Sequence, residues 1–184
     1  EFWSWFESLE SRMDPDSPDP IVLEDMDYWL GRISPNLSFE LGKSGRKHTL
    51  TISADGRAAL VPLVDKLVGD APKIDGWKFV SLRQKQKHLR PVTVGGTTLD
   101  PDNLFFDLYD DGPRFGVAFY LPEFVHAQVD EYRVAAMRLM SMSVGERNVA
   151  SWIGFVDFDR HGVRDMAFSR PFAEFETVFD GLRK

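Results

Sequence analysis

The sequence predicts an α+β fold of two layers, in which two ββαβ units form a mainly antiparallel sheet covered by helices. Two observations lead to this prediction. The apolar residues repeat with a helical period in residues 1–34 and change to the period of a strand at residue 37. The order of the predicted elements then recurs in the second half of the chain. At 184 residues, one domain is expected. Its parts are a helical hairpin (1–34), a first ββαβ unit (37–83), a basic linker loop (84–102), a second ββαβ unit (103–159) and a C-terminal helix (169–184).

The first helix is predicted from an aromatic stripe at the start of the chain. At about 100° per residue, one face of this helix carries Phe2, Phe6, Leu9 and Met13, and Trp3 and Trp5 lie at its edges. We expect this helix to pack on the sheet or on the neighbouring helix, with both tryptophans filling the joint, because large aromatic residues are mostly buried. The alternative is an exposed aromatic patch that recruits a partner or forms a dimer.

A second helix is predicted after the segment DPDSPDP, residues 14–20, because its prolines cannot continue the first helix. Asp19 can cap the N-terminus of the second helix, and Pro20 suits its first position. Its apolar arc consists of Val22, Leu23, Met26, Trp29, Leu30 and Ile33. The two helices together form the predicted hairpin.

The first ββαβ unit begins where the apolar period becomes two. Residues 37–42 and 48–53 alternate apolar and polar side chains on either side of a turn, which is typical of a β-hairpin. A helix is expected to begin near Ala59, because Pro62 is tolerated only in a first turn. Residues 77–82 are predicted to form the third strand.

The second unit repeats this order about 66 residues later. Residues 104–109 and 115–121 are its predicted hairpin, and a helix is expected over residues 124–142, ending at Gly145. Residues 152–158 form the next predicted strand. We expect the two hairpins to merge into one twisted sheet, because each sheet face and each helix stripe must be buried against another element.

Composition limits the class of protein. The chain has no cysteine, which excludes disulfides, zinc sites with thiolate ligands and cysteine nucleophiles. No apolar run approaches the roughly 20 residues that a membrane span needs, and the first residues do not have the pattern of a secretion signal. We therefore expect a cytoplasmic protein with no membrane partner.

Charge is distributed unevenly along the chain, whose net charge is −7. Residues 1–30 hold nine acidic side chains and one arginine, whereas residues 76–99 hold five basic side chains and no acid. The candidate interaction surface in this basic stretch consists of Arg83, Lys85, Lys87, His88 and Arg90. It would bind an acidic protein surface or mediate self-association. The alternatives are a stretch that is only solvated, or one that pairs with the acidic hairpin of the same chain.

Few residues form a pattern with catalytic or ligand-binding chemistry. Gly42-Lys43-Ser44 resembles the end of a phosphate-binding loop, but Leu37 stands where that motif needs a glycine. Residues 157–165 match part of a calcium-binding loop, but Phe168 stands where a bidentate glutamate is needed. We therefore assign no catalytic, cofactor-binding or metal-ligating residue. Carboxylates distant in the sequence could still meet in space, namely Glu40, Asp107 and Glu146.

Glu40 is an unusual position within the first predicted strand. It alternates with Phe39 and Leu41, so its side chain belongs on the opposite face of the sheet. If that face is covered, the carboxylate needs a cation or hydrogen-bond donors.

Several short segments resemble a known family. The chain contains WSWF at 3–6, LSFELG at 37–42, LTISADG at 50–56, APKIDGW at 71–77 and GERNVASWIGFVDF at 145–158. Together they resemble a family of small bacterial cytosolic proteins of unknown function. These motifs are turn and core residues, so the resemblance implies a shared fold and no particular activity. A looser likeness, as a small acidic α+β protein, is to regulators that bind and inhibit bacterial ribonuclease E, and no binding residue matches there.

The leading hypothesis is a non-enzymatic protein-interaction or regulatory module, because charge is segregated and no catalytic pattern is recognised. The alternative is an enzyme or small-ligand binder with a pocket between the sheet and the linker 84–102, using scattered carboxylates or His88. A third hypothesis is weak binding of nucleic acid, with an affinity that falls steeply as salt rises. It is disfavoured because residues 83–102 contain no aromatic side chain for base stacking.

Overall fold

The computed structural model describes residues 1–9, 12–121, 124–160 and 169–183. The chain divides into two compact units, Glu1–Arg83 (unit 1) and Gln84–Lys184 (unit 2). Each unit has its own hydrophobic core and its own main sheet, and the fold is α+β, as predicted. The single domain expected from the length stays a prediction, because this division does not show whether the two units fold together.

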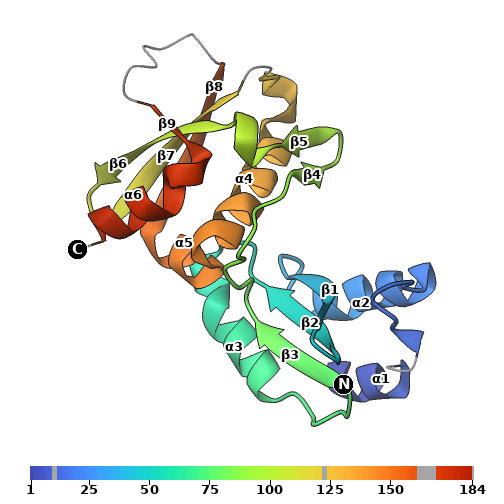
Figure 1. Ribbon diagram of the computed structural model, residues 1–184. Coiled ribbons are helices and arrows are strands. Elements are labelled where there is room, and N and C mark those ends of the chain that lie inside the picture. The colour runs from blue at the N-terminus through green and yellow to red at the C-terminus, as the bar shows by residue number, and fades with distance from the viewer. Residues whose placement is uncertain (10–11, 122–123, 161–168, 184) are drawn as a thin grey trace. The chain divides into compact units, whose positions relative to one another are not determined.

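Unit 1 has the predicted order of elements (Figure 1). Its helices and strands are α1 (Phe2–Leu9), α2 (Pro20–Ile33), β1 (Ser38–Ser44), β2 (Lys47–Ser53), α3 (Val61–Gly69) and β3 (Trp77–Ser81). β1 and β2 form an antiparallel hairpin, and β3 lies parallel to β2, so the strand order is β1-β2-β3. This is one ββαβ unit with α3 as the crossover helix.

The ends of these helices confirm the predictions from capping residues. The side chain of Asp19 accepts a hydrogen bond from the backbone N–H of Ile21 at 3.0 Å, and Pro20 is the first residue of α2. A short 3-10 turn, Ala58–Leu60, leads into α3, which places Pro62 in the first turn. The missing N–H of Pro62 therefore costs α3 no hydrogen bond.

The aromatic start of the chain belongs to the core of unit 1, as predicted. Phe6 is fully buried and meets the rings of Trp77 and Phe79 edge-on, at centroid distances of 5.0 and 5.4 Å. The indole nitrogen of Trp3 donates a hydrogen bond to the backbone oxygen of Leu67 in α3 at 2.9 Å. Both Trp3 and Trp5 are half-buried and packed against the core, so they do not form the exposed patch of the alternative interpretation.

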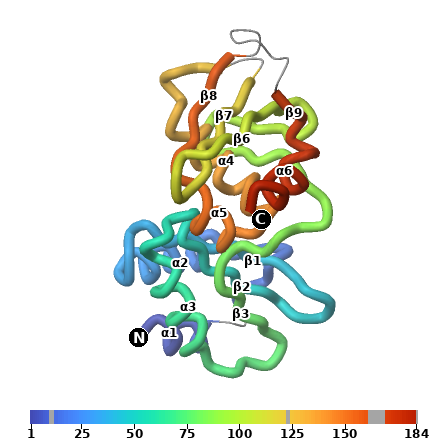
Figure 2. The backbone as a smooth tube through the Cα atoms, turned by 90° about the vertical axis from the view of Figure 1, so that its left-hand side faces the viewer, coloured from blue at the N-terminus to red at the C-terminus, as the bar shows by residue number. Residues whose placement is uncertain are grey.

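Unit 2 begins with a small hairpin and continues with a second ββαβ unit (Figure 2). Its helices and strands are β4 (Val92–Val94), β5 (Thr97–Leu99), β6 (Phe105–Asp111), β7 (Arg114–Leu121), α4 (Val129–Val144), α5 (Glu146–Trp152), β8 (Ile153–Arg160), β9 (Arg170–Pro171) and α6 (Phe175–Leu182), with 3-10 turns at Pro101–Asn103, His126–Gln128 and Phe172–Glu174. The main sheet has the order β8-β7-β6-β9, with β8 parallel to β7 and the other neighbours antiparallel.

The core of unit 2 is built around β7. The register places Phe115, Val117 and Phe119 on one face of this strand, and all three belong to the buried cluster. Residues of the helices complete this cluster, including Leu139 of α4 and Phe175 of α6, which are fully buried. The sheet of unit 2 is thus covered on this face by its own helices.

Four details differ from the sequence-based predictions. The described strands of the two ββαβ units form separate sheets rather than one merged sheet, because each hairpin gains a third strand and its own helices to cover it. Residues 84–102 are not a loop throughout, since β4 and β5 form a hairpin there. The unpredicted helix α5 follows Gly145, and the unpredicted strand β9 precedes α6. The second half of the candidate calcium-binding loop, residues 161–165, lies outside the described residues.

Candidate functional site

Arg83 is buried, so its inclusion in the predicted interaction surface is wrong. Its side chain is 4% exposed, and its Nε donates to Glu40 Oε1 at 2.5 Å. One terminal nitrogen donates to Asp55 Oδ1 and to Ser53 Oγ, both at 2.6 Å. The other terminal nitrogen donates to Ser38 Oγ at 3.0 Å. Arg83 is therefore the cation beside Glu40, although the Glu40 side chain is itself 42% exposed and so is not buried as the sequence analysis had considered.

This arginine network lies where the chain leaves the sheet of unit 1. Leu82 has a φ of 62°, a left-handed conformation that costs a branched side chain about 1–3 kcal/mol. Burial lowers the pKa of Arg83, but the attraction of Asp55 and Glu40 outweighs it, and the pKa lies above its usual value. The guanidinium therefore stays charged and holds β1, β2 and the end of β3 together.

The rest of the predicted surface, residues 85–90, is here called the basic segment. The backbone N–H of Gln86 donates to the oxygen of Met142 at 2.8 Å, and Leu89 packs against the core of unit 2. Lys85 forms an ion pair with Glu176. Lys87, His88 and Arg90 are exposed. The basic segment is thus held at Lys85, Gln86 and Leu89, while the other three side chains remain outward.

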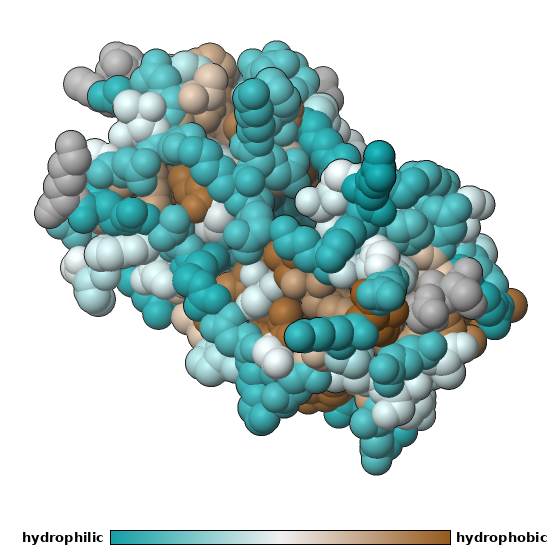
Figure 3. All heavy atoms as spheres, turned by 60° about the horizontal axis from the view of Figure 1, so that its bottom comes forward, coloured by the Kyte–Doolittle hydropathy of each residue, from teal (hydrophilic) through white to brown (hydrophobic). Residues whose placement is uncertain are grey.

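A second charged surface lies on α2. Ile21 and Tyr28, two turns apart, are 63% and 61% exposed, and Glu24 and Asp27 are exposed between them. We call these four residues the acidic α2 face. Figure 3 shows that hydrophilic side chains dominate one side of the molecule, with hydrophobic ones in patches among them. Few large apolar residues are exposed in the described part of the chain, and Ile21 and Tyr28 are two of them.

The distant carboxylates have separate surroundings. Glu40 binds Arg83, and Asp107 accepts a hydrogen bond from the Tyr120 hydroxyl at 2.7 Å. Glu146 begins α5 and is fully buried. Within the described ranges, no three His, Asp or Glu side chains are grouped so that they could hold a metal ion. The candidate calcium loop cannot be followed, because its His161 and Asp165 lie outside those ranges.

A cavity of about 410 Å³ lies where the alternative hypothesis places a pocket, beside residues of the segment 84–102. Its walls come from β5, the end of β7 and the start of α4, and include Thr98, Leu121 and Tyr132. His88 does not line it, and Asp100 is its only carboxylate among the described lining residues. The walls offer mainly hydroxyl and amide groups rather than a pair of acid–base residues.

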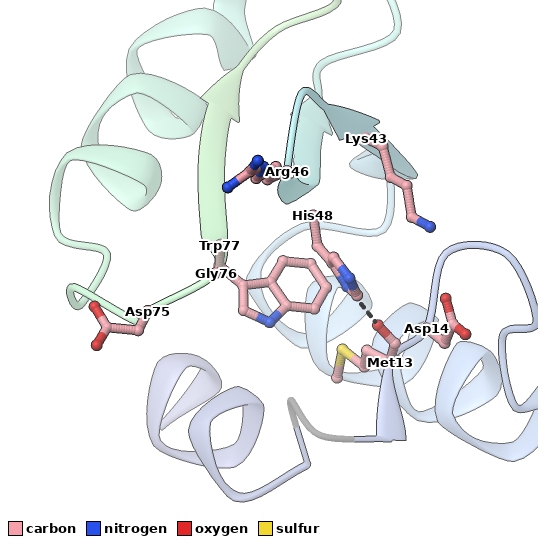
Figure 4. Close-up of a pocket in the computed structure, with 8 residues that line it drawn as sticks. All are labelled: Met13, Asp14, Lys43, Arg46, His48, Asp75, Gly76 and Trp77. Carbon is pink, nitrogen blue, oxygen red and sulfur yellow. Dashed lines mark hydrogen bonds between the residues drawn. The ribbon is translucent and has the colours of Figure 1, made fainter.

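A more strongly charged pocket, of about 480 Å³, lies at one end of the sheet of unit 1 (Figure 4). We call it the His48–Trp77 pocket; its lining residues are Met13, Asp14, Lys43, Arg46, His48, Asp75, Gly76 and Trp77. His48 and Trp77 are partners in the parallel register of β2 and β3, and their ring centroids are 5.2 Å apart. Strand β1 supplies Lys43 and the hairpin turn supplies Arg46, while the segment between α1 and α2 supplies Met13 and Asp14.

The sequence analysis did not find this pocket. His48 appeared there as one of four isolated histidines, and Lys43 as part of an incomplete phosphate-binding motif. The pocket depends on β3 pairing with β2 in parallel, which places Trp77 beside a histidine 29 positions earlier in the chain. A tryptophan at the start of the strand that follows a ββα pattern is the one local signal that could have indicated it.

Comparison of the chain with protein-family models, with curated proteins and with solved structures finds no match. Among the described residues, no helix is long and apolar enough to cross a membrane. The geometry of the charged surfaces is therefore the basis for a functional proposal.

Proposed function

We propose that the protein is a non-enzymatic interaction module whose basic segment binds an acidic surface of a partner protein. One observation supports this most directly: Lys87, His88 and Arg90 face solvent on a segment that is fixed at Gln86 and Leu89. If these basic side chains served only to keep the loop in contact with water, its backbone would not need to be fixed in this way. An anchored backbone loses less conformational entropy when it binds, so more of the interaction energy remains as affinity.

The outward-facing basic side chains are not neutralised by ion pairs within unit 2. No ion pair of Lys87 or Arg90 occurs with any described residue, whereas Lys85 is already paired with Glu176. Clustered charges of one sign raise the rate of association with an oppositely charged surface and suppress wrong partners. Lys87 and Arg90 are therefore the residues on which the proposal depends, and Lys85 is not.

The test is a charge reversal with a matched control. We expect the double substitution Lys87→Glu and Arg90→Glu to remove bound partners from a quantitative pull-down, and to weaken the affinity of each purified partner at least tenfold. The control reverses two exposed basic residues elsewhere, Arg57→Glu and Lys73→Glu, with the same change in net charge. The control should bind like the wild type.

Three results would overturn the proposal. Equal capture by both variants would show that the basic segment has no role. Loss of captured nucleic acid rather than protein would support the nucleic-acid hypothesis instead. A concentration-dependent dimer in light scattering that Glu24→Lys and Asp27→Lys abolish would show self-association through the acidic α2 face rather than binding of a different protein.

A further inference from the structure

Arg138 of α4 has a guanidinium group without a counter-charge in the described chain. Its Nε is buried and has no hydrogen-bond partner, which is true of no other side-chain nitrogen or oxygen among the described residues. No ion pair of Arg138 occurs with any described residue either. Buried polar groups normally have a partner, so this arginine needs an explanation.

The two terminal nitrogens of Arg138 reach the surface of the protein. Neither of them is enclosed as Nε is, and neither has a partner within the described ranges. The side chain as a whole is half-buried. Nε is therefore closed to a ligand, whereas the outer edge of the guanidinium, with the N–H groups of both terminal nitrogens, is open to one.

The neighbours of Arg138 on α4 cannot supply its counter-charge. Residues three and four positions apart lie beside one another on a helix. The four residues at these positions are Val134, Ala135, Ser141 and Met142. None of them is acidic. Arg133 on the same helix differs, because its guanidinium donates to Asp130 at 2.8 Å. Arg133 is thus the matched control for Arg138.

Arg138 lies on the side of α4 along which the basic segment runs. At about 100° per residue, positions 138 and 142 point within about 20° of the direction of position 131. Glu131 accepts a hydrogen bond from the Thr97 hydroxyl at 2.8 Å. The backbone oxygen of Met142 accepts one from the N–H of Gln86, also at 2.8 Å. The chain between Gln86 and Thr97 therefore passes Arg138, and Figure 1 shows this part of the chain beside α4.

The positive charges on this side of α4 have no acid to pair with. Lys87 and Arg90 belong to the stretch of chain that passes Arg138, and they too form no ion pair with a described residue. The carboxylate of Glu131 is already held by β5. The counter-charge that Arg138 lacks is therefore one that a binding partner can supply.

We propose that Arg138 binds a carboxylate side chain of the partner protein through its two terminal nitrogens, and that it contributes more to the affinity than Lys87 or Arg90. Two parallel N–H groups of a guanidinium match the two oxygens of a carboxylate. Because Nε is already withdrawn from water, Arg138 loses less hydration on binding than a fully exposed cation does. This inference rests on the function proposed above and names the group that is recognised.

The test follows the Nε–H signal of Arg138 in NMR spectra of the ¹⁵N-labelled full chain, where the variant Arg138→Gln identifies the signal by its absence. The first probe is an acetylated hexaglutamate peptide, and the second is a hexaglutamine peptide of the same length without charge. We expect hexaglutamate to shift the signal and hexaglutamine to leave it unchanged. A third probe, an oligonucleotide of twelve thymidines, offers phosphates in place of carboxylates.

Affinities of the variants are compared at the backbone amide signal of Gln86, which all of them retain. We expect Arg138→Gln to weaken hexaglutamate binding about tenfold, the loss of a hydrogen bond between charged groups. Lys87→Gln and Arg90→Gln should each weaken it about threefold or less, because exposed charges contribute less. The control Arg133→Gln removes one positive charge from the same helix and should bind like the wild type.

Thermal unfolding separates binding from a structural role of Arg138. Replacing an arginine whose buried Nε has no partner removes an unsatisfied polar group, so the midpoint of Arg138→Met should equal or exceed that of the wild type. A residue that only supports the fold would give a lower midpoint. Loss of hexaglutamate binding with retained stability is therefore the result expected of a recognition residue.

Several results would overturn the inference. They are an Arg138 signal that hexaglutamate does not shift at about 1 mM, equal effects of Arg138→Gln and Arg133→Gln, and a shift caused by the oligonucleotide but not by hexaglutamate. A lower midpoint of Arg138→Met with unchanged affinity would show a structural role instead. If the inference alone fails, Lys87→Glu with Arg90→Glu still loses its partners in the pull-down while Arg138→Gln keeps them. If the proposed function fails, both variants keep them.

Discussion

The two ββαβ units have the same topology but are stabilised differently. In both, a two-residue turn with a left-handed glycine joins the hairpin, at Gly45 and Gly112. In both, the third residue pair from that turn contains a glycine, which is Gly42 opposite Thr49 in unit 1 and Gly116 opposite Tyr109 in unit 2. The glycine is thus on the first strand in one unit and on the second strand in the other.

The central strands show the main difference. In β7 every residue after Arg114 is buried, whereas β2 contains exposed and half-buried positions as well as buried ones. Unit 2 gains β9 and α5 and has a large phenylalanine core. Unit 1 relies on the aromatic helix α1 and on the charged network of Arg83. The same ββαβ topology can therefore be stabilised either by a larger buried apolar area or by a buried cation with its carboxylate partners.

The largest expected effects come from truncating the two cores. Leu50 and Phe119 are fully buried at the centres of β2 and β7, so Leu50→Ala and Phe119→Ala should lower the free energy of unfolding by about 2–5 and 3–5 kcal/mol. Four of the five tryptophans lie in unit 1, so in a Trp152→Phe background fluorescence reports that unit alone. Because each core contains residues of one unit only, we expect Phe119→Ala to leave the fluorescence midpoint in urea unchanged.

That experiment also tests the domain organisation. Leu50→Ala is the matched control, since it must shift the fluorescence midpoint whichever organisation is correct. If Phe119→Ala shifts it equally, the two units unfold cooperatively, as the single domain predicted from the length requires.

The next largest effect concerns the buried cation of unit 1. Arg83→Met keeps the length of the side chain but leaves Glu40 and Asp55 without their cation, and we expect a loss of about 3–5 kcal/mol. Arg83→Lys should recover only part of it, because an ammonium group cannot reproduce the fork that reaches four side chains. Arg90→Met, a change of the same type at an exposed position, should alter stability by less than about 0.5 kcal/mol in urea denaturation. Equal losses of stability in Arg83→Met and Arg90→Met would contradict the role of Arg83 as the buried cation that stabilises unit 1.

The smallest effect distinguishes the two hairpin glycines. A Cβ at Gly116 would lie 2.5 Å from the ring of Phe155 and 2.6 Å from that of Tyr109, so both rings must move. Gly116→Ala should therefore cost about 1–3 kcal/mol through overpacking. A Cβ at Gly42 would meet one atom, the hydroxyl oxygen of Thr49 at 3.1 Å, which can rotate away. Gly42→Ala should be close to neutral in thermal unfolding, and a larger loss there than at Gly116 would show that the hairpins do not differ as described.

Much of the local structure could be predicted because it depends on neighbours in the chain. Asp19 and Pro20 fixed the start of α2, and Pro62 fixed that of α3. The helical spacing of Phe2 and Phe6 predicted that they would be buried together. The division into separate sheets could not be predicted, because the pairing of strands depends on contacts between distant residues. Helix α5 was not predicted at all, because a helix of only seven residues is too short to give a clear apolar period.

The sequence by itself determined which segments become helices and strands and which faces are apolar, because side-chain period, caps and turns act over a few residues. Only the tertiary structure decided what the charged residues do. Arg83 and Arg90 belong to the same basic stretch, yet the first is enclosed by Glu40 and Asp55 and the second faces solvent. His48 meets Trp77 only through the parallel register of β2 and β3. The strand that carries a residue determines which face its side chain lies on. The contacts of that side chain are determined by the neighbouring strands, which come from distant parts of the chain.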